Sequence, residues 1–197
     1  MKPGSIPNPS RRIAIVAAAG CAMAALHARA QGPAEELEAW DALRAGGIVL
    51  FRHAQAPGVG DPAAFRLGDC GTQRNLDAAG RNQSRRIGER LRAQNVVVGK
   101  VLASQWCRTM DTANLAFPGQ VVPAPAFNSF FQDRDNATAQ TAAARTLLQQ
   151  WNGPGALVVV THQVNITALT DQFTRSGEGI VLRRHAGTLE RVGRILP

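Results

Sequence analysis

The sequence predicts an α/β fold, a three-layer sandwich in which a mostly parallel central sheet carries helices on both faces. Short apolar runs alternate with stretches of helical periodicity along the chain, as in βαβ units. The run 156–161 is almost continuous Val and Leu, which is typical of a central strand covered on both faces. A length of 197 residues, 45% of them hydrophobic, favours one domain with a substantial core.

The first strand is expected at 48–51, where four apolar residues end abruptly in Arg52 and His53. A helix over 35–45, closed by two glycines, precedes it. The pair at the strand end has the chemistry of a phosphate site. A guanidinium offers a fork of donors to phosphate oxygens, and a neutral imidazole can attack phosphorus.

The middle of the chain repeats this pattern. Residues 55–73 are rich in Gly and Pro, and a loop of this length is usually functional. A helix follows from the N-cap Asp77 to about residue 95. A strand over 100–104 then leads into a helix over 107–117, with Arg108 in its first turn.

The last third supplies another strand that ends in a histidine. The sequence predicts, in order, a short strand at 121–122, a loop to 136, an Ala-rich helix over 138–151, the strand 156–161 followed by His162, a helix over 164–173, and an edge hairpin of 180–184 with 188–195.

Three motifs in this order resemble the histidine phosphatase superfamily, the phosphoglycerate-mutase-like enzymes. They are the Arg-His pair after the first strand, an Arg in a Ser-x-x-x-Arg-x-x-x-Thr-Ala context, and a late His after a hydrophobic strand. The matching residues are Arg52, His53, Arg108 and His162, and Asn75-Leu76 with Gly80 resembles a further segment of the family. The resemblance covers about residues 46–173.

The resemblance implies a role for each matching residue. His53 would attack phosphorus, while Arg52, Arg108 and His162 would hold the equatorial oxygens. It also implies that Arg74 and Asn75 contact the substrate, and Gln163 offers a further donor at a helix N-terminus. No cofactor or metal is expected, because His53 and His162 lack a third ligand at a sensible spacing.

The proton donor to the leaving group departs from the family pattern. His162 is followed by Gln163, where one branch of the family has Asp, and the segment 127–135, where the other branch has Glu, contains no Glu. The segment does contain Asp133, which Phe130 and Phe131 are expected to desolvate, raising its pKa. Asp135 is the alternative.

The function that follows is an exported phosphohydrolase that cleaves phosphate monoesters through a phosphohistidine. A catalytically silent anion-binding module of the same fold and a phosphomutase are the alternatives. A small phosphorylated molecule is the expected partner, and the sequence names neither the substrate nor the oligomeric state.

Residues 1–30 have the form of a signal peptide. Basic residues precede the apolar stretch 13–26, and Ala28-Arg29-Ala30 fits a signal-peptidase site, so we expect cleavage after Ala30 and a periplasmic or secreted domain of residues 31–197. The general secretory route is favoured over the twin-arginine route. A lipid-anchored form at Cys21 is the lesser alternative, and no stable membrane span is expected after cleavage.

The positive charge does not indicate a nucleic-acid partner. The chain carries a net charge of +8, and four of these charges belong to Lys2, Arg11, Arg12 and Arg29 of the signal, which leaves +4. No run of basic residues is interleaved with aromatic ones, so we expect no nucleic-acid binding.

Two cysteines, Cys70 and Cys107, remain after the signal, in a compartment where thiols oxidise. Cys107 precedes Arg108, and Cys70 lies in the loop expected beside the same pocket. A disulfide between them is predicted, with two separately buried thiols as the alternative.

Overall fold

The computed structural model describes Met1 and residues 33–196. The predicted signal peptide, its cleavage after Ala30 and the lipid-anchor residue Cys21 lie outside the described residues. The body formed by the later residues is built from six strands and five α-helices. These are α1 (Pro33–Arg44), β1 (Ile48–Arg52), α2 (Ala78–Ala93), β2 (Val98–Ala103), α3 (Cys107–Ala116), β3 (Val121–Pro123), α4 (Ala137–Gln149), β4 (Ala156–Thr161), α5 (Gln163–Thr170), β5 (Gly179–His185) and β6 (Thr188–Ile195).

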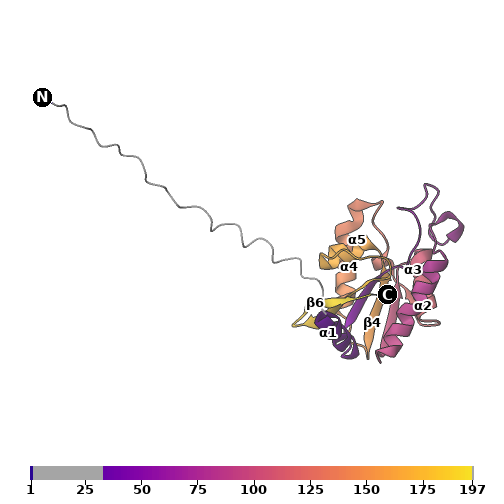
Figure 1. Cartoon of the computed structure of the whole chain (residues 1–197). Coiled ribbons are helices and arrows are strands. Elements are labelled where there is room, and N and C mark those ends of the chain that lie inside the picture. The colour runs from indigo at the N-terminus through magenta and orange to yellow at the C-terminus, as the bar shows by residue number, and fades with distance from the viewer. Residues whose placement is uncertain (2–32, 197) are drawn as a thin grey trace. The chain divides into compact units, whose positions relative to one another are not determined.

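The predicted α/β sandwich is confirmed. The six strands form one sheet in the order β3-β2-β4-β1-β5-β6. The β3, β2, β4 and β1 strands are parallel, and β5 and β6 add an antiparallel hairpin at one edge. Figure 1 shows α4 and α5 on one side of β4 and α2 and α3 on the other.

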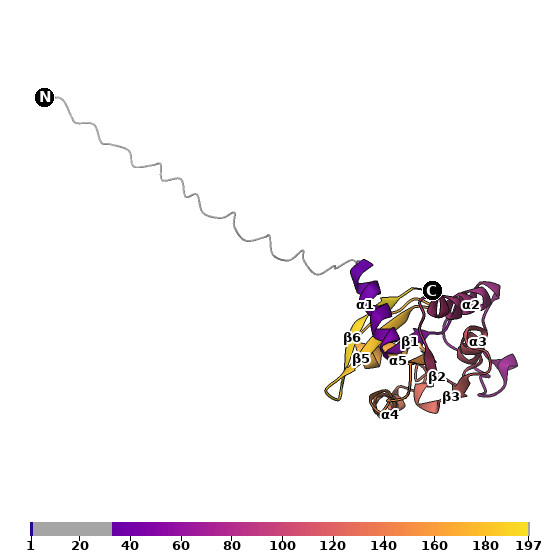
Figure 2. The same ribbon diagram turned by 90° about the horizontal axis from the view of Figure 1, so that it is seen from below.

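Alternation along the strands divides the core into two layers. Val49 and Phe51 of β1 pack with residues of α1, α2 and α3, whereas Ile48 and Leu50 pack with α4 and α5. Figure 2 views the sheet end-on, with α1, α2 and α3 above it and α4 below. All six residues of β4 are buried, as predicted for a central strand.

The helix boundaries follow local capping chemistry. The Asp77 carboxylate accepts a hydrogen bond from the Gly80 amide at 2.7 Å, so Asp77 is the N-cap of α2 as predicted. The helix predicted to reach residue 173 is shorter than expected. It ends at Thr170 because Asp171 adopts a left-handed conformation with φ 59°.

None of the helices in residues 33–196 has the length and apolar character needed to cross a membrane.

Candidate active site

Three parallel strands deliver the site to one edge of the sheet. Arg52 pairs with Thr161 and Ala103 with Val160, so β1, β2 and β4 end at nearly the same level. The residues directly after these strands are His53, Ser104 and His162. The His53 amide donates to Thr161 O at 2.9 Å and the Ser104 amide to Val160 O at 3.0 Å, so the sheet ladder fixes the backbone of the site.

The geometry of His53 suits a nucleophile. Its Nδ1 lies 2.7 Å from the carbonyl oxygen of Ala54, which can only accept, so Nδ1 carries the proton and Nε2 keeps its lone pair. Burial, followed by the charge of Arg108, lowers the pKa of His53 from 6.5 to about 3. The imidazole is therefore neutral at physiological pH.

His162 faces the first histidine across the site. The two ring centroids lie 5.6 Å apart, with an interplanar angle of 66°. Nε2 of His162 lies 2.8 Å from Ser104 Oγ, which leaves Nδ1 as the ring nitrogen that a ligand can use. Burial, followed by the proximity of His53 and Arg108, holds the pKa of His162 well below its ordinary value.

Three arginines bring positive charge to the same cavity. Arg52 Nη1 donates to Thr174 O at 2.8 Å, and Arg74 donates from Nε to Gly60 O at 2.9 Å and from Nη1 to Ala56 O. The pKa of Arg52 and that of Arg74 are both lowered, mainly by burial and secondly by the charge of Arg108. The guanidinium groups therefore repel one another, and a bound anion would relieve that repulsion.

Asp61 holds the third arginine. Its carboxylate accepts from Arg108 Nη1 at 2.5 Å and Nη2 at 3.1 Å, and also from Trp106 Nε1 at 2.9 Å. The side chains of Arg108 and Asp61 are only 3% and 5% exposed. Burial raises the pKa of Asp61, but the hydrogen bonds from Arg108 and Trp106 outweigh it and leave the pKa below its usual range.

Sequence reasoning missed Asp61. Among the described residues that line the cavity, it is the one carboxylate. It lies in the loop 55–73, which was expected to be functional, between Gly60, whose φ is 68°, and Pro62. An acidic residue between two turn formers beside the nucleophile strand was the available signal.

Covalent and aromatic contacts fasten that loop to α3. The predicted disulfide is confirmed, because Cys70 and Cys107 are joined with a Cα–Cα distance of 5.7 Å. The Cys107 amide also donates to Gln73 Oε1 at 2.9 Å. The Phe65 ring stacks on Trp106 with centroids 5.0 Å apart. The loop that carries Asp61 is therefore held in place at Phe65 and again at Cys70 and Gln73.

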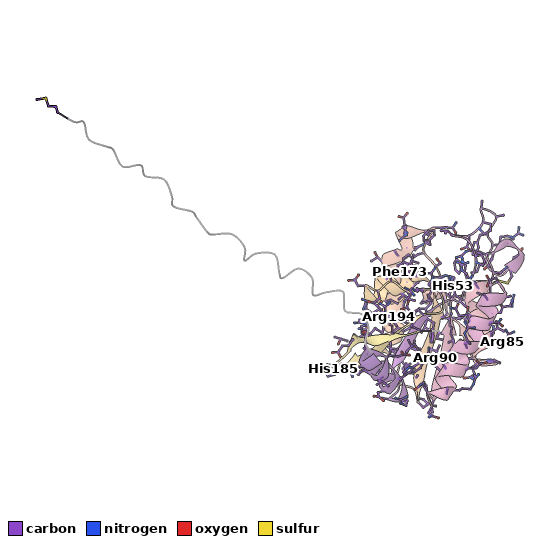
Figure 3. The ribbon with its side chains drawn as sticks, viewed as in Figure 1. His53, Arg85, Arg90, Phe173, His185 and Arg194 are labelled. Carbon is purple, nitrogen blue, oxygen red and sulfur yellow. A yellow bond between two sulfur atoms is a disulfide. The ribbon has the colours of Figure 1, made fainter. Side chains whose placement is uncertain are left out.

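These groups surround a cavity of about 200 Å³. Six of the predicted site residues line it, namely Arg52, His53, Arg74, Arg108, His162 and Gln163. Its other lining residues are Gly58, Val59, Gly60, Asp61, Ser129, Phe131, Val164 and Phe173. Figure 3 shows His53 and Phe173 toward the same end of the sheet.

The structure does not bring Asp133 into this cavity. Its side chain is exposed and accepts a hydrogen bond from Asn136, and it is absent from the lining residues. The desolvation expected from Phe130 and Phe131 is not seen, because Phe130 is buried in the core while the carboxylate stays in solvent.

Asn75 and Gln163 make structural hydrogen bonds. Asn75 Nδ2 donates to Cys70 O at 2.7 Å, so it holds the loop and does not line the cavity. Gln163 does line it, but its Oε1 accepts from the Thr174 amide at 2.8 Å and its Nε2 donates to Thr167 Oγ1 at 2.7 Å.

Within the described residues, no group of three or more His, Cys, Asp or Glu side chains is arranged to hold a metal ion. The cavity instead presents three positive charges, one negative charge and two neutral imidazoles. Such a site is chemically suited to an oxyanion.

The sequence matches no family model and no curated protein. The structure is similar to several solved phosphatases at low sequence identity. The protein histidine phosphatase SixA, complexed with tungstate, gives a TM-score of 0.56 at 16% identity and covers 76% of this chain and 96% of its own.

Two further structures show the same likeness. The mycobacterial glucosyl-3-phosphoglycerate phosphatase Rv2419c, complexed with VO3, gives a TM-score of 0.56 at 16% identity, over 74% of this chain and 96% of its own. Phosphoserine phosphatase from Entamoeba histolytica, in complex with 3-phosphoglyceric acid, gives 0.56 at 10% identity, over 77% and 98%. The predicted fold is thus confirmed: the chain has the phosphoglycerate-mutase-like fold of the histidine phosphatases.

Proposed function

We propose that this protein is a phosphatase that hydrolyses phosphate monoesters through a phosphohistidine on His53. The observation that carries the proposal is the unprotonated Nε2 of a buried, neutral His53 beside three arginines. The fold supports it, because the similar structures are phosphatases, two of them with bound tungstate or vanadate.

The chemistry follows from the lining groups. Nε2 of His53 attacks phosphorus as the ester P–O bond breaks, and Arg52, Arg108 and His162 stabilise the equatorial oxygens. Removing one such preorganised donor typically costs on the order of 10²-fold or more in rate. Water then attacks the phosphohistidine, which releases inorganic phosphate and regenerates the imidazole.

We propose Asp61 as the proton donor to the leaving oxygen. The hydrogen bonds from Arg108 keep its carboxylate ionised. A phosphate ester that binds Arg108 weakens this ion pair and places a second anion beside the carboxylate, and both effects raise the pKa of Asp61. Asp61 then takes up a proton with the substrate, passes it to the leaving oxygen, and recovers a proton from the attacking water.

The intermediate is tested by rapid acid-free quenching with a radiolabelled ester. Acid-labile, alkali-stable label is expected on the wild-type chain and not on His53→Ala. Full turnover by His53→Ala would overturn the proposal. Oxyanion binding without any turnover by the wild type would favour the silent anion-binding alternative.

The proton donor is tested with two matched variants, Asp61→Asn and Asp133→Asn. Asp61→Asn should slow alkyl phosphates much more than p-nitrophenyl phosphate, whose leaving group needs little protonation. Asp133→Asn should resemble the wild type. If Asp133→Asn alone hydrolyses alkyl phosphates more slowly, the proton donor is Asp133, as the sequence suggested.

We also propose that the protein is exported and works in the periplasm or outside the cell. The disulfide between Cys70 and Cys107 supports this, because such bonds persist in oxidising compartments. Cell fractionation with N-terminal sequencing should find a chain that begins at Gln31. An intact N-terminus in the cytosolic fraction would contradict export, and acylated Cys21 would establish the lipid-anchored form.

A further inference from the structure

We propose that the substrate is a phosphate monoester whose alcohol carries an aromatic or similarly bulky apolar group close to the phosphate. This inference rests on the proposed phosphatase function and names the substrate class of the same cavity. It is carried by three exposed apolar side chains around the cavity mouth, Val59, Phe131 and Phe173, which we call the apolar rim.

Each residue of the apolar rim is well exposed to solvent. Val59 is 90% exposed, Phe173 is 70% exposed and Phe131 is 45% exposed. They come from three separate segments: the loop after β1, the segment between β3 and α4, and the segment between α5 and β5. All three nevertheless line the same cavity, and apolar side chains gathered at a cavity are typical of a ligand-binding site.

The distribution of phenylalanine strengthens this argument. The chain has seven phenylalanines, all of them among the described residues. Only Phe131 and Phe173 among these are exposed, and both line the cavity. The guanidinium carbon of Arg134 lies 5.5 Å from the centroid of the Phe131 ring, a cation–π contact that holds this ring beside the mouth.

The polar side chains of the lining argue against a sugar-like alcohol. Both amide atoms of Gln163 are used by Thr174 and Thr167, whereas Ser129 Oγ accepts from the Phe131 amide at 3.3 Å and keeps its O–H as a donor. The remaining polar side chains of the lining are the two histidines, the three arginines and Asp61. Among the described lining residues outside these charged and imidazole groups, Ser129 is the one side chain left to hydrogen-bond a polyol, so most of the hydroxyls of a polyol would gain no side-chain partner.

The charged side chains of the lining also argue against a phosphoamino acid as the favoured substrate. An ammonium group would need an acidic partner, and Asp61, the one carboxylate among the described lining residues, is assigned above to protonate the leaving oxygen and so is neutral when the substrate is bound. Apolar surface next to a strongly cationic floor instead complements a molecule with a phosphate at one end and a ring or branched chain at the other.

The test compares 2-phenylethyl phosphate with glycerol 1-phosphate. Both are esters of primary alcohols, so leaving-group chemistry contributes little to the comparison. We expect the wild type to prefer the phenyl ester in kcat/KM by about 10-fold or more, and Phe173→Ala to reduce that preference by about 5- to 10-fold, as expected for the loss of one aromatic contact. Val97→Ala is the matched control. Val97 is 69% exposed and lies just before the start of β2, whereas the cavity lies beyond the ends of the parallel strands, so the preference should not change.

Equal kcat/KM for the two esters, or an unchanged preference in Phe173→Ala, would overturn the inference and leave the phosphatase proposal standing. If neither ester is hydrolysed, the phosphatase proposal fails instead. Calorimetric binding of 2-phenylethylphosphonate and 2-hydroxyethylphosphonate then tests the apolar rim without catalysis. Tighter binding of the phenyl compound that weakens in Phe173→Ala supports the rim, and equal binding refutes it.

Discussion

The Asp61→Asn substitution is expected to make the protein less stable and at the same time a better binder of phosphate. The carboxylate and Arg108 form a two-pronged ion pair with distances of 2.5 and 3.1 Å, almost fully removed from solvent. Asparagine keeps nearly the same size, but it removes the negative charge and leaves Arg108 beside Arg52 and Arg74 without compensation.

The magnitude follows from the burial of the pair. Breaking a buried ion pair costs about 3 to 5 kcal/mol, and the lower end applies here because the amide oxygen still accepts a hydrogen bond from Trp106. For a chain of this size, about 3 kcal/mol corresponds to a fall of roughly 6 to 12 °C in Tm. Without its internal anion, the site should bind inorganic phosphate on the order of 10-fold more tightly.

Thermal unfolding with and without inorganic phosphate measures both effects, since a ligand of the folded state raises Tm by an amount that grows with the logarithm of its concentration divided by its Kd. Asp41→Asn is the matched control. Its ion pair with Arg44 has a similar distance of 2.6 Å but is exposed, so its loss should cost at most about 1 kcal/mol. If Asp61→Asn unfolds at the wild-type temperature and phosphate stabilises it no further, the carboxylate does not compete for Arg108.

Two further predictions concern stability. The double variant Cys70→Ser with Cys107→Ser should lose about 3 to 4 kcal/mol in its free energy of unfolding, because the disulfide closes a loop with a sequence separation of 37. Denaturant titration under oxidising conditions measures this loss, and equal stability of the wild type and the double variant would mean that the two thiols are unpaired. The pKa of His53 is about 3 in the fold against an ordinary 6.5, so between these pH values the unfolded chain binds more protons than the folded one. The free energy of unfolding should therefore be greatest above about pH 6.5 and fall as the pH drops, and it should fall less steeply in His53→Asn. If the wild type and His53→Asn show the same dependence of stability on pH, His53 does not have a lowered pKa.

The sequence predicts most of the fold because its elements depend on local signals. The continuous apolar runs identify β1 and β4, and the Asp77 cap identifies the start of α2. The end of α5 was placed three residues too late, because nothing local indicates that Asp171 takes a left-handed conformation. The order of the strands is a tertiary property that periodicity does not contain.

The candidate site divides in the same way. His53, Arg108 and His162 follow strands or begin helices, so their convergence follows from the parallel sheet. The role of Asp61 depends on an ion pair to a residue 47 positions away, which only the folded loop creates. Asp133 was chosen for its neighbours in sequence, but the chain turns so that Phe130 enters the core without it.

The division between strand ends and loops has a consequence for how this protein can change. The groups assigned to phosphate are held by the sheet ladder, by α3 and by a disulfide, so they tolerate little alteration. The side chains of the apolar rim come from three separate loop segments and are themselves exposed, so they contribute little to the core. Descendants of this chain can therefore acquire new substrates by single replacements at the mouth, one segment at a time, without re-evolving the reaction itself.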